Sequence, residues 1–438
     1  MKTLLLLCAV AGLHAQTITL SPGDSLAAAL TAKRIVVRGG DYFLSEPVVL
    51  GARNSGLTIE AAPGETPTFY GGRRIAGWSK SGERFWSAEA PADFRMLVVN
   101  GRRARPARLP ATGYFTHETE FKVRWMGTSG GGWQRKPAEQ ELNTMRYKPG
   151  DLGPWLDLAS VELTVYHMWD ESLVRLRALD PQTRTLTFAN PSGHPPGAFN
   201  VQRYVVWNVR EGMTAPGQWY LDRGTRRVYY WPLEGEDMTR AEVLAPLVES
   251  IVRIEKARDI TLRGLRFSVT NTPPVAGGFG AGKFEGAVAL NDTDGCRLED
   301  LTVFNTGGQG IKAQNARGLR IAGCEVRDTG ACGIIARGEA AEIADNHVHH
   351  VGATYPSAIG IYCGGKNLLI AHNEVHDTPY TAVNCGGAGH RIESNSIYRA
   401  MLELHDGAAF YTIFGKGIVL RGNLVRDIPD TGGYGSSS

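Results

Sequence analysis

The chain has 438 residues, which is enough for one large core or for two domains. Its formal net charge at pH 7 is only +3, too small and too scattered to indicate a nucleic-acid partner. Beyond the first residues, no stretch is long and apolar enough to span a membrane.

Residues 1–15 are predicted to be a secretory signal peptide of bacterial type. Lys2 is followed by an apolar run over residues 4–13, and Leu13-His14-Ala15 resembles a cleavage site before Gln16. We therefore expect a secreted or periplasmic protein. Removal of Cys8 leaves five cysteines at core-like positions, and this odd number argues against a disulfide framework.

Residues 16–110 are predicted to form an N-terminal cap and the first coils of a solenoid. Asp24 or Ser25 can cap a short helix within residues 26–33, which would cover the unpaired strands at the end of the solenoid. Strand-like runs follow, separated by Gly and Pro turns, at 35–37, 48–50, 57–59 and 68–70.

Residues 111–245 are predicted to be an inserted antiparallel β domain, a sandwich or small barrel. Their strand-like runs alternate between polar and apolar residues, and they contain most of the tryptophans of the chain. Core packing is the commoner fate of such tryptophans, and a sugar-binding platform is the alternative. The tryptophans are Trp125, Trp133, Trp155, Trp169, Trp207, Trp219 and Trp231.

Residues 246–438 contain a repeat of apolar or small residues at positions 0, +3 and +5. Most units are close to 22 residues long, as between Ile321 and Ile343. Units of this length that are rich in Gly, Asn and β-branched residues are typical of a solenoid of strands. Asn346, Asn373, Asn395 and Asn423 share one position, so we predict a right-handed parallel β-helix with an asparagine ladder.

The position of the second strand in each unit predicts where a site lies. Insertions within 351–358 and 400–408 fall at one corner, just before this strand. Alternation along the strand then directs Tyr362, Asn384 and Tyr411 outward, beside that corner. His349 and His376 form a second outward row before the corner, and stacked rows of this kind suit a polymeric ligand.

Asp406, at the junction of the loop and the strand, is the predicted catalytic carboxylate, since glycoside hydrolysis uses paired carboxyl groups. Turn capping is the alternative role. The predicted sugar contacts are His405, Tyr411, Asn384, Tyr362, His376 and His349. We predict no metal and no cofactor, because no Cys or carboxylate completes a ligand set around His347 and His349.

Several stretches together resemble the parallel β-helix enzymes of glycoside hydrolase family 141 and their relatives. The resemblance covers nearly the whole chain after residue 15, and it implies an interrupted β-helix acting on plant-type glycans such as xylan or fucosylated side chains. It also implies that Asp406 is one of two catalytic carboxylates. The stretches are IEAAPGE (59–65), YGGRRIAGW (70–78), VNGRRA (99–104), PGQWYLD (216–222), VYYWP (228–232) and HDGAAFY (405–411).

The chain departs from the family pattern at its C-terminus, where a strand with the second acidic residue is expected. We therefore expect the chain to be truncated, with that carboxylate beyond Ser438 and the activity of the fragment in doubt. The predicted protein is a monomeric, secreted glycoside hydrolase of xylanase or α-L-fucosidase type acting on a polysaccharide. A polysaccharide lyase using Lys312 as base and a non-catalytic glycan-binding protein remain alternatives.

Overall fold

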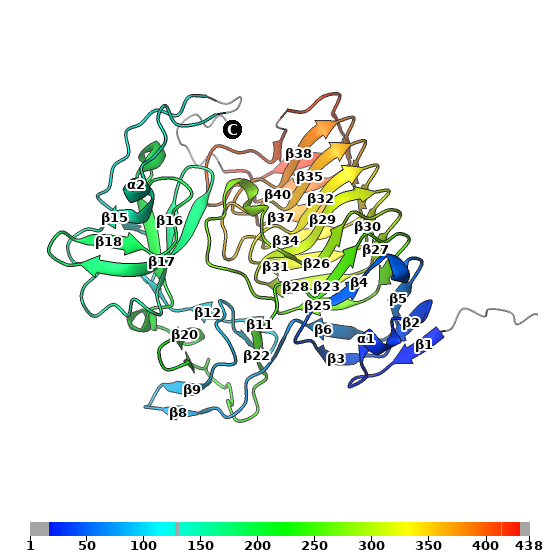
Figure 1. The fold of residues 1–438 in the computed structure, drawn as a ribbon, viewed down its shortest axis with the longest axis horizontal. Coiled ribbons are helices and arrows are strands. Elements are labelled where there is room, and N and C mark those ends of the chain that lie inside the picture. Colours follow the sequence, from blue (N-terminus) through cyan, green and yellow to red (C-terminus); the bar gives the residue numbers. More distant parts are fainter. Residues whose placement is uncertain (1–16, 128–130, 413, 430–438) are drawn as a thin grey trace, which may run out of the picture.

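The computed structural model describes residues 17–127, 131–412 and 414–429, so the predicted signal peptide and the expected truncation lie outside the described residues. Three long parallel sheets, here called A, B and C, wind into a right-handed β-helix (Figure 1). Each coil places one strand in sheet A, one in sheet B and one in sheet C. The predicted fold class is therefore confirmed.

The coils stack in parallel register, with one shift between Ala313 and Ala316, where β29 pairs with β32. Sheet A contains β1 (Thr17–Leu20), β2 (Arg34–Val37), β5 (Thr58–Ala61), β24 (Thr261–Arg263), β27 (Arg297–Glu299), β30 (Arg320–Ala322), β33 (Glu342–Ala344), β36 (Leu369–Ala371), β39 (Arg391–Glu393) and β42 (Val419–Arg421). Sheet B contains β3 (Gly40–Phe43), β6 (Pro67–Tyr70), β25 (Arg266–Ser268), β28 (Thr302–Thr306), β31 (Glu325–Thr329), β34 (His347–His349), β37 (Glu374–His376), β40 (Ser396–Tyr398) and β43 (Leu424–Arg426). Sheet C contains β4 (Val48–Leu50), β23 (Val252–Glu255), β26 (Gly286–Asn291), β29 (Gln309–Arg317), β32 (Ile334–Glu339), β35 (Ile361–Lys366), β38 (Val383–Ala388) and β41 (Phe410–Tyr411).

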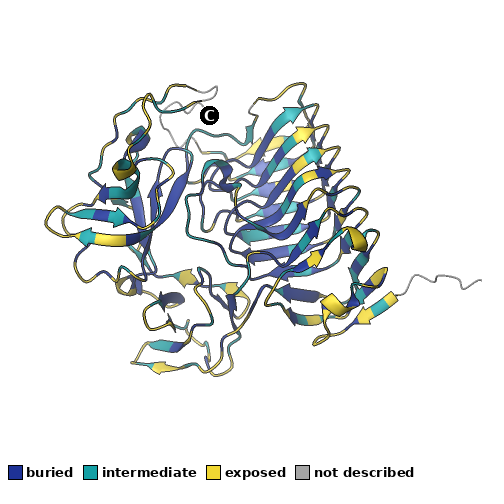
Figure 2. Ribbon diagram, in the orientation of Figure 1, coloured by how far each residue is buried: buried dark blue, intermediate teal, exposed yellow. Residues whose placement is uncertain are grey.

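The interior of the helix is filled by the apolar positions of the repeat. Ile321, Val326 and Ile334, one from each sheet, are fully buried, and each stacks on its equivalents in neighbouring coils. Figure 2 shows this core as a continuous buried band along the coils. Burial of this apolar surface is the main source of stability in a solenoid.

The predicted asparagine ladder is confirmed. The Nδ2 of Asn346 donates to Oδ1 of Asn373 at 2.9 Å, and the same 2.9 Å bond links Asn373 to Asn395 and Asn395 to Asn423. Each of these side chains also donates to a backbone carbonyl of the preceding coil, as Asn373 does to Ile343 at 2.9 Å. The buried amides of these four successive coils thus have hydrogen-bond partners.

The N-terminal end of the β-helix is covered by a short α-helix, as predicted. Helix α1 (Leu26–Ala29) begins after Ser25, whose Oγ accepts a hydrogen bond from the backbone N–H of Ala28 at 3.3 Å. Leu26 and Ala29 face the core and contribute to its first layer. No helix among the described residues is long and apolar enough to cross a membrane.

The inserted region begins earlier than the predicted residue 111. Strand β7 (Gly72–Arg74) pairs antiparallel with β22 (Val243–Pro246), so residues 72–110 belong to the insert and not to the coils. The chain leaves the helix after β6 and returns at β23. The prediction was wrong here because short alternating strands look alike in a parallel coil and in an antiparallel sheet.

The insert contains three antiparallel or mixed sheets, and its two largest apolar cores are separate from each other. One sheet consists of β7, β22, β10 (Val98–Val99) and β11 (Arg102–Arg103), and a second of β8 (Ser79–Ser81), β9 (Phe85–Glu89), β12 (Arg105–Pro106), β20 (Gln218–Asp222) and β21 (Arg227–Tyr230). The third consists of β13 (Arg108–Leu109), β14 (Phe115–Thr116), β15 (Thr144–Arg146), β16 (Glu162–Tyr166), β17 (Glu171–Asp180), β18 (Thr185–Phe188) and β19 (Arg203–Trp207). The short helices of the insert are α2 (Glu139–Asn143), η2 (Ala198–Asn200) and η3 (Arg210–Gly212). Two more, η1 (Ala52–Asn54) and η4 (Phe279–Ala281), lie in turns of the β-helix.

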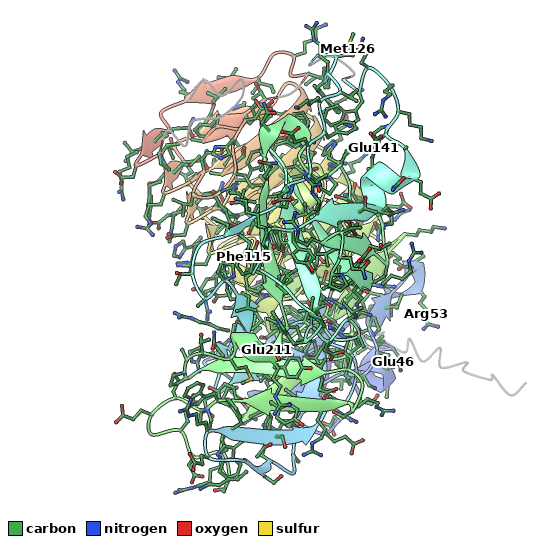
Figure 3. The ribbon with its side chains drawn as sticks, turned by 90° about the vertical axis from the view of Figure 1, so that its left-hand side faces the viewer. Glu46, Arg53, Phe115, Met126, Glu141 and Glu211 are labelled. Carbon is green, nitrogen blue, oxygen red and sulfur yellow. The ribbon has the colours of Figure 1, made fainter. Side chains whose placement is uncertain are left out.

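The insert packs along one side of the helix. In Figure 3 this side faces the viewer, with Met126 near the upper end of the insert and Glu211 in its lower part. Core packing is the fate of Trp219, which is 2% exposed and stacks on Phe94 at 5.4 Å.

The contacts between the insert and the helix converge on the corner between sheets B and C. The fully buried carboxylate of Glu171 accepts hydrogen bonds from the backbone N–H of Ser357 at 2.7 Å and from its hydroxyl at 3.2 Å. The hydroxyl of Tyr166 donates to Glu403 at 2.6 Å. The corner insertions, whose position was predicted correctly, therefore hold the insert in place.

Candidate functional site

Asp406 lies at the end of the 400–408 loop, where this loop enters sheet C. Its backbone has a positive φ of 57°, and its main-chain carbonyl accepts a hydrogen bond from the hydroxyl of Tyr380 at 2.8 Å. The following residue must be small, because a Cβ on Gly407 would lie 2.6 Å from the Tyr380 ring. Half-burial raises the pKa of the Asp406 carboxyl above its usual value of 3.8. A carboxyl of this kind holds its proton at higher pH, as a general acid requires.

The predicted outward row lies beside this carboxyl in continuous register. Tyr362 pairs with Asn384, and Asn384 pairs with Tyr411, on three successive coils. Asn384 is 2% exposed, and its Nδ2 has no hydrogen-bond partner among the described residues. The row therefore presents two phenol rings around one unsatisfied amide donor.

An aromatic side chain from an earlier coil covers the row. The ring centre of Phe279, in the 272–286 insertion, lies 6.1 Å from Tyr362, 6.1 Å from Tyr380 and 6.2 Å from Tyr411. The guanidinium of Arg337 stacks over Tyr362 at 4.7 Å. Aromatic faces and a stacked cation of this kind form an apolar wall with polar edges.

The insert contributes a second carboxylate to this neighbourhood. Asp406 and Asp170 both help to raise the pKa of Tyr380, although burial is the largest cause and Tyr411 the next. Asp170 is 3% exposed, its Oδ1 has no described partner, and its Oδ2 lies 3.5 Å from Nε2 of His194. Burial lowers the pKa of Lys283, and the charges of Glu171 and Asp170 oppose that shift.

A half-buried aromatic cluster of the insert adjoins Asp170. The rings of Trp125, Trp133, Trp169 and Phe199 contact one another and the imidazole of His194, which in turn reaches Asp170. These tryptophans are less buried than Trp219, so they are available for a role besides core packing.

His405 lies at the contact between the loop and the insert. Its backbone N–H donates to the carbonyl of Met168 at 3.0 Å, two residues before Asp170 in the chain.

His349 and His376 are not part of this group. They pair in register on the outer face of sheet B, where the rings stack at 4.9 Å, and Tyr398 extends the row. Their other partners are His347, His350, Asp377 and Glu325, none of which contacts Asp406 or Tyr411 among the described residues. The predicted sugar contacts therefore lie on two faces of the helix.

Lys312, the base of the lyase alternative, and Glu403, the other carboxylate of the 400–408 loop, both have structural partners. Nζ of Lys312 donates to the carbonyl of Phe284 at 2.7 Å and thereby holds the 272–286 insertion in place. Glu403 accepts from Tyr166 at 2.6 Å and from Tyr114 at 3.2 Å.

Sequence reasoning did not identify Tyr380, Phe279 or Asp170. Tyr380 lies in a turn and Phe279 in the short helix η4, both outside the repeat positions. Asp170 comes from the insert, more than 200 residues before Asp406. The one available signal was Trp169-Asp170-Glu171, a pair of carboxylates beside a tryptophan.

Comparisons with known proteins agree with this architecture. The family model "Right handed beta helix region" matches residues 286–438. A solved structure described as "Glycoside hydrolase" is 19% identical, with a TM-score of 0.77, and the match covers 95% of this chain and 88% of the other. A second, "The complex structure of XylC with xylose", is 15% identical, with a TM-score of 0.51, and the match covers 93% of this chain and 65% of the other. None of the curated proteins compared with the chain matches it. At these identities the likeness establishes the fold.

Proposed function

We propose that the protein is a glycoside hydrolase that acts on a polysaccharide or oligosaccharide at the corner between sheets B and C. The observation that carries the proposal is the half-buried carboxyl of Asp406, with its raised pKa, beside the outward row of Tyr362, Asn384 and Tyr411. Such a carboxyl can donate a proton to the leaving glycosidic oxygen. Fold neighbours described as "Glycoside hydrolase" and as XylC with xylose support the same class.

The second carboxyl group is proposed to be Asp170. The charges of Asp170 and Asp406 both act on the hydroxyl of Tyr380, so the two carboxyl groups share one neighbourhood. Asp170 is almost fully buried, and one of its oxygens lacks a described partner. A buried polar atom without a partner is costly unless a ligand satisfies it. In this arrangement the helix and the insert each supply one carboxylate, and His405 holds the two parts together through Met168.

The sugar contacts follow from the same geometry. Tyr362 and Tyr411 offer ring faces and hydroxyls, and Asn384 offers its free amide donor. As the resemblance to family 141 implies, the substrates to test first are xylan, xylo-oligosaccharides and fucosylated plant glycans. Export from the cell, with removal of residues 1–15, is part of the same proposal.

Substitution of Asp406 tests the proposal directly. The variant Asp406→Asn should lose roughly 10³-fold or more in kcat/KM for release of reducing ends, because the proton donor is gone, while its circular dichroism and Tm stay unchanged. The matched control is Asp345→Asn, which replaces an exposed turn aspartate that also has a positive φ, of 57°. Full activity in Asp406→Asn would refute the assignment.

A parallel assay of Asp170→Asn separates the two carboxylates. Loss of turnover with retained folding is expected, whereas retained turnover would assign the second carboxylate to another residue. An unsaturated product that requires Ca²⁺ would indicate a lyase. Binding of polymer without any product would indicate a glycan-binding protein.

A further inference from the structure

Four histidines gather on the outer face of sheet B, away from the neighbourhood of Asp406. His347 and His349 come from β34, His376 comes from the next coil, and His350 follows His349 in the turn. One ring nitrogen from each of His347, His349 and His376 can be chosen so that the three lie within 4.8 Å of one another. The repeat spacing predicted that His349 and His376 share an outward row, and the register of β34 and β37 places them side by side. The sequence did not predict that His347 lies close enough to both for one ion.

His376 is already oriented as a metal ligand would be. Its Nδ1 lies 2.6 Å from Oδ2 of Asp377, and Oδ1 of Asp377 accepts a hydrogen bond from Arg399 at 2.7 Å. A carboxylate that holds the Nδ1–H of a histidine leaves the Nε2 lone pair free, and histidine ligands of metals commonly have such a partner. Nε2 of His376 faces Nε2 of His347 at 2.8 Å.

This spacing is close to what one ion needs. Two nitrogens bound tetrahedrally to zinc at 2.0–2.1 Å lie about 3.3 Å apart, so small ring rotations would admit the ion between His347 and His376. In the free protein the same two Nε2 atoms lie within hydrogen-bonding distance of each other, at 2.8 Å.

His349 supplies the third nitrogen. Its ring is parallel to that of His376, with an interplanar angle of 5°, and its shielded Nε2 has no hydrogen-bond partner among the described residues. Burial and the neighbouring histidines lower the pKa of His349 to about 4. Oε1 of Glu325 lies 3.7 Å from this Nε2, on a side chain that is 41% exposed.

We propose that His347, His349 and His376 bind one divalent transition-metal ion of the zinc type, with Glu325 or solvent as the fourth ligand. Neutral imidazoles select zinc and its first-row neighbours over Mg²⁺ and Ca²⁺. The ion would link adjacent coils of the helix. This role replaces the sugar contacts that the sequence suggested for His349 and His376, and it does not depend on the proposed hydrolase activity.

The test uses tag-free protein freed of metal with a chelator. Zn²⁺ titration by calorimetry should give one site per chain with a Kd in the micromolar range or tighter, and saturation should raise Tm by about 2 °C or more. Co²⁺ should give the visible absorption of a tetrahedral site, whereas Mg²⁺ should have no effect. The variants His347→Ala and His376→Ala should each lose the site, and His372→Asn, at an exposed turn on the same helix, should retain it.

Three outcomes would overturn the proposal. The first is no Zn²⁺ binding by the folded protein. The second is equal binding by the His347→Ala and His376→Ala variants. The third is binding that survives His347→Ala but is lost in His350→Ala, because the ion would then sit between His350, His376 and Asp377, whose ligand atoms also lie within 4.8 Å of one another.

Discussion

At the scale of single residues, a substitution of Asn384 should affect the stability of the protein and its proposed activity in different ways. Its buried Nδ2 has no described partner, so folding carries a desolvation cost that no hydrogen bond offsets. Asn384→Leu, which keeps the branching at Cγ and removes the polar atoms, should leave the free energy of unfolding unchanged or raise it by about 1 kcal/mol. In the same variant, kcat/KM should fall by roughly 10-fold, because a donor to the sugar is lost. Urea unfolding and steady-state kinetics check both parts, and a clear loss of stability would mean that the amide is satisfied in the free protein.

As the proposed proton donor, the carboxyl of Asp406 should set the pH dependence of turnover. Because burial raises its pKa, the group stays protonated above pH 3.8, and the rate should fall as the pH rises through the higher value. The sign is the same for stability, since a raised pKa in the folded state stabilises at low pH and loses this contribution as the group ionises. A pH–rate profile of kcat/KM tests this, and a basic limb that is unchanged in an active Asp406→Glu variant would assign the proton to another group.

At the scale of elements, the asparagine ladder is what lets the turns between sheets A and B be buried. Asn373 accepts from the side chain and the backbone N–H of Asn346, at 2.9 and 3.1 Å, and donates to Asn395 and Ile343. Asn373→Ala would leave several of these groups unsatisfied and should lower the free energy of unfolding by about 2–4 kcal/mol. Asn291→Ala, at an exposed strand end on the same helix, is the control and should change it by less than about 0.5 kcal/mol. Equal effects of the two substitutions would argue against the ladder as a source of stability.

At the scale of the whole molecule, Glu171 connects the insert to the helix. Burial is the main cause of the raised pKa of Glu171, and the nearby charge of Asp170 raises this pKa further. Gln can accept the same bond from the backbone of Ser357, whereas Ala cannot. Glu171→Gln should therefore stay within about 1 kcal/mol of the natural protein, while Glu171→Ala should lose about 2–4 kcal/mol and become sensitive to proteolysis in the insert.

The pH dependence of unfolding gives an independent check on Glu171. Since its folded pKa is raised, its contribution to stability is complete below the ordinary value of 4.5 and is lost as the pH rises through the folded pKa. The natural protein should lose more stability toward alkaline pH than Glu171→Gln does. An identical alkaline fall in both proteins would show that Glu171 is already ionised in the folded state.

The fold could be predicted because every coil repeats the same local rule. Ile321, Val326 and Asn346 occupy positions that recur along the chain, and the strand register follows from that recurrence alone. The start of the insert could not be predicted, because Gly72–Arg74 looks like any short strand until it pairs with residues 243–246. Periodicity therefore identified the solenoid but not the point at which the chain leaves it.

For this protein, the sequence by itself determined the β-helix, its asparagine ladder, the corner with the insertions and the outward row beside Asp406. Each of these depends on spacing within one coil or between adjacent coils, which a repeating chain makes explicit. Only the tertiary structure decided that Asp170 lies with Asp406 near Tyr380, that Phe279 lies beside Tyr411, and that Glu171 fastens the insert. It also decided that Nε2 of His347 faces Nε2 of His376. These contacts join segments from different coils or from the insert, and side-chain packing in three dimensions, not spacing along the chain, sets them.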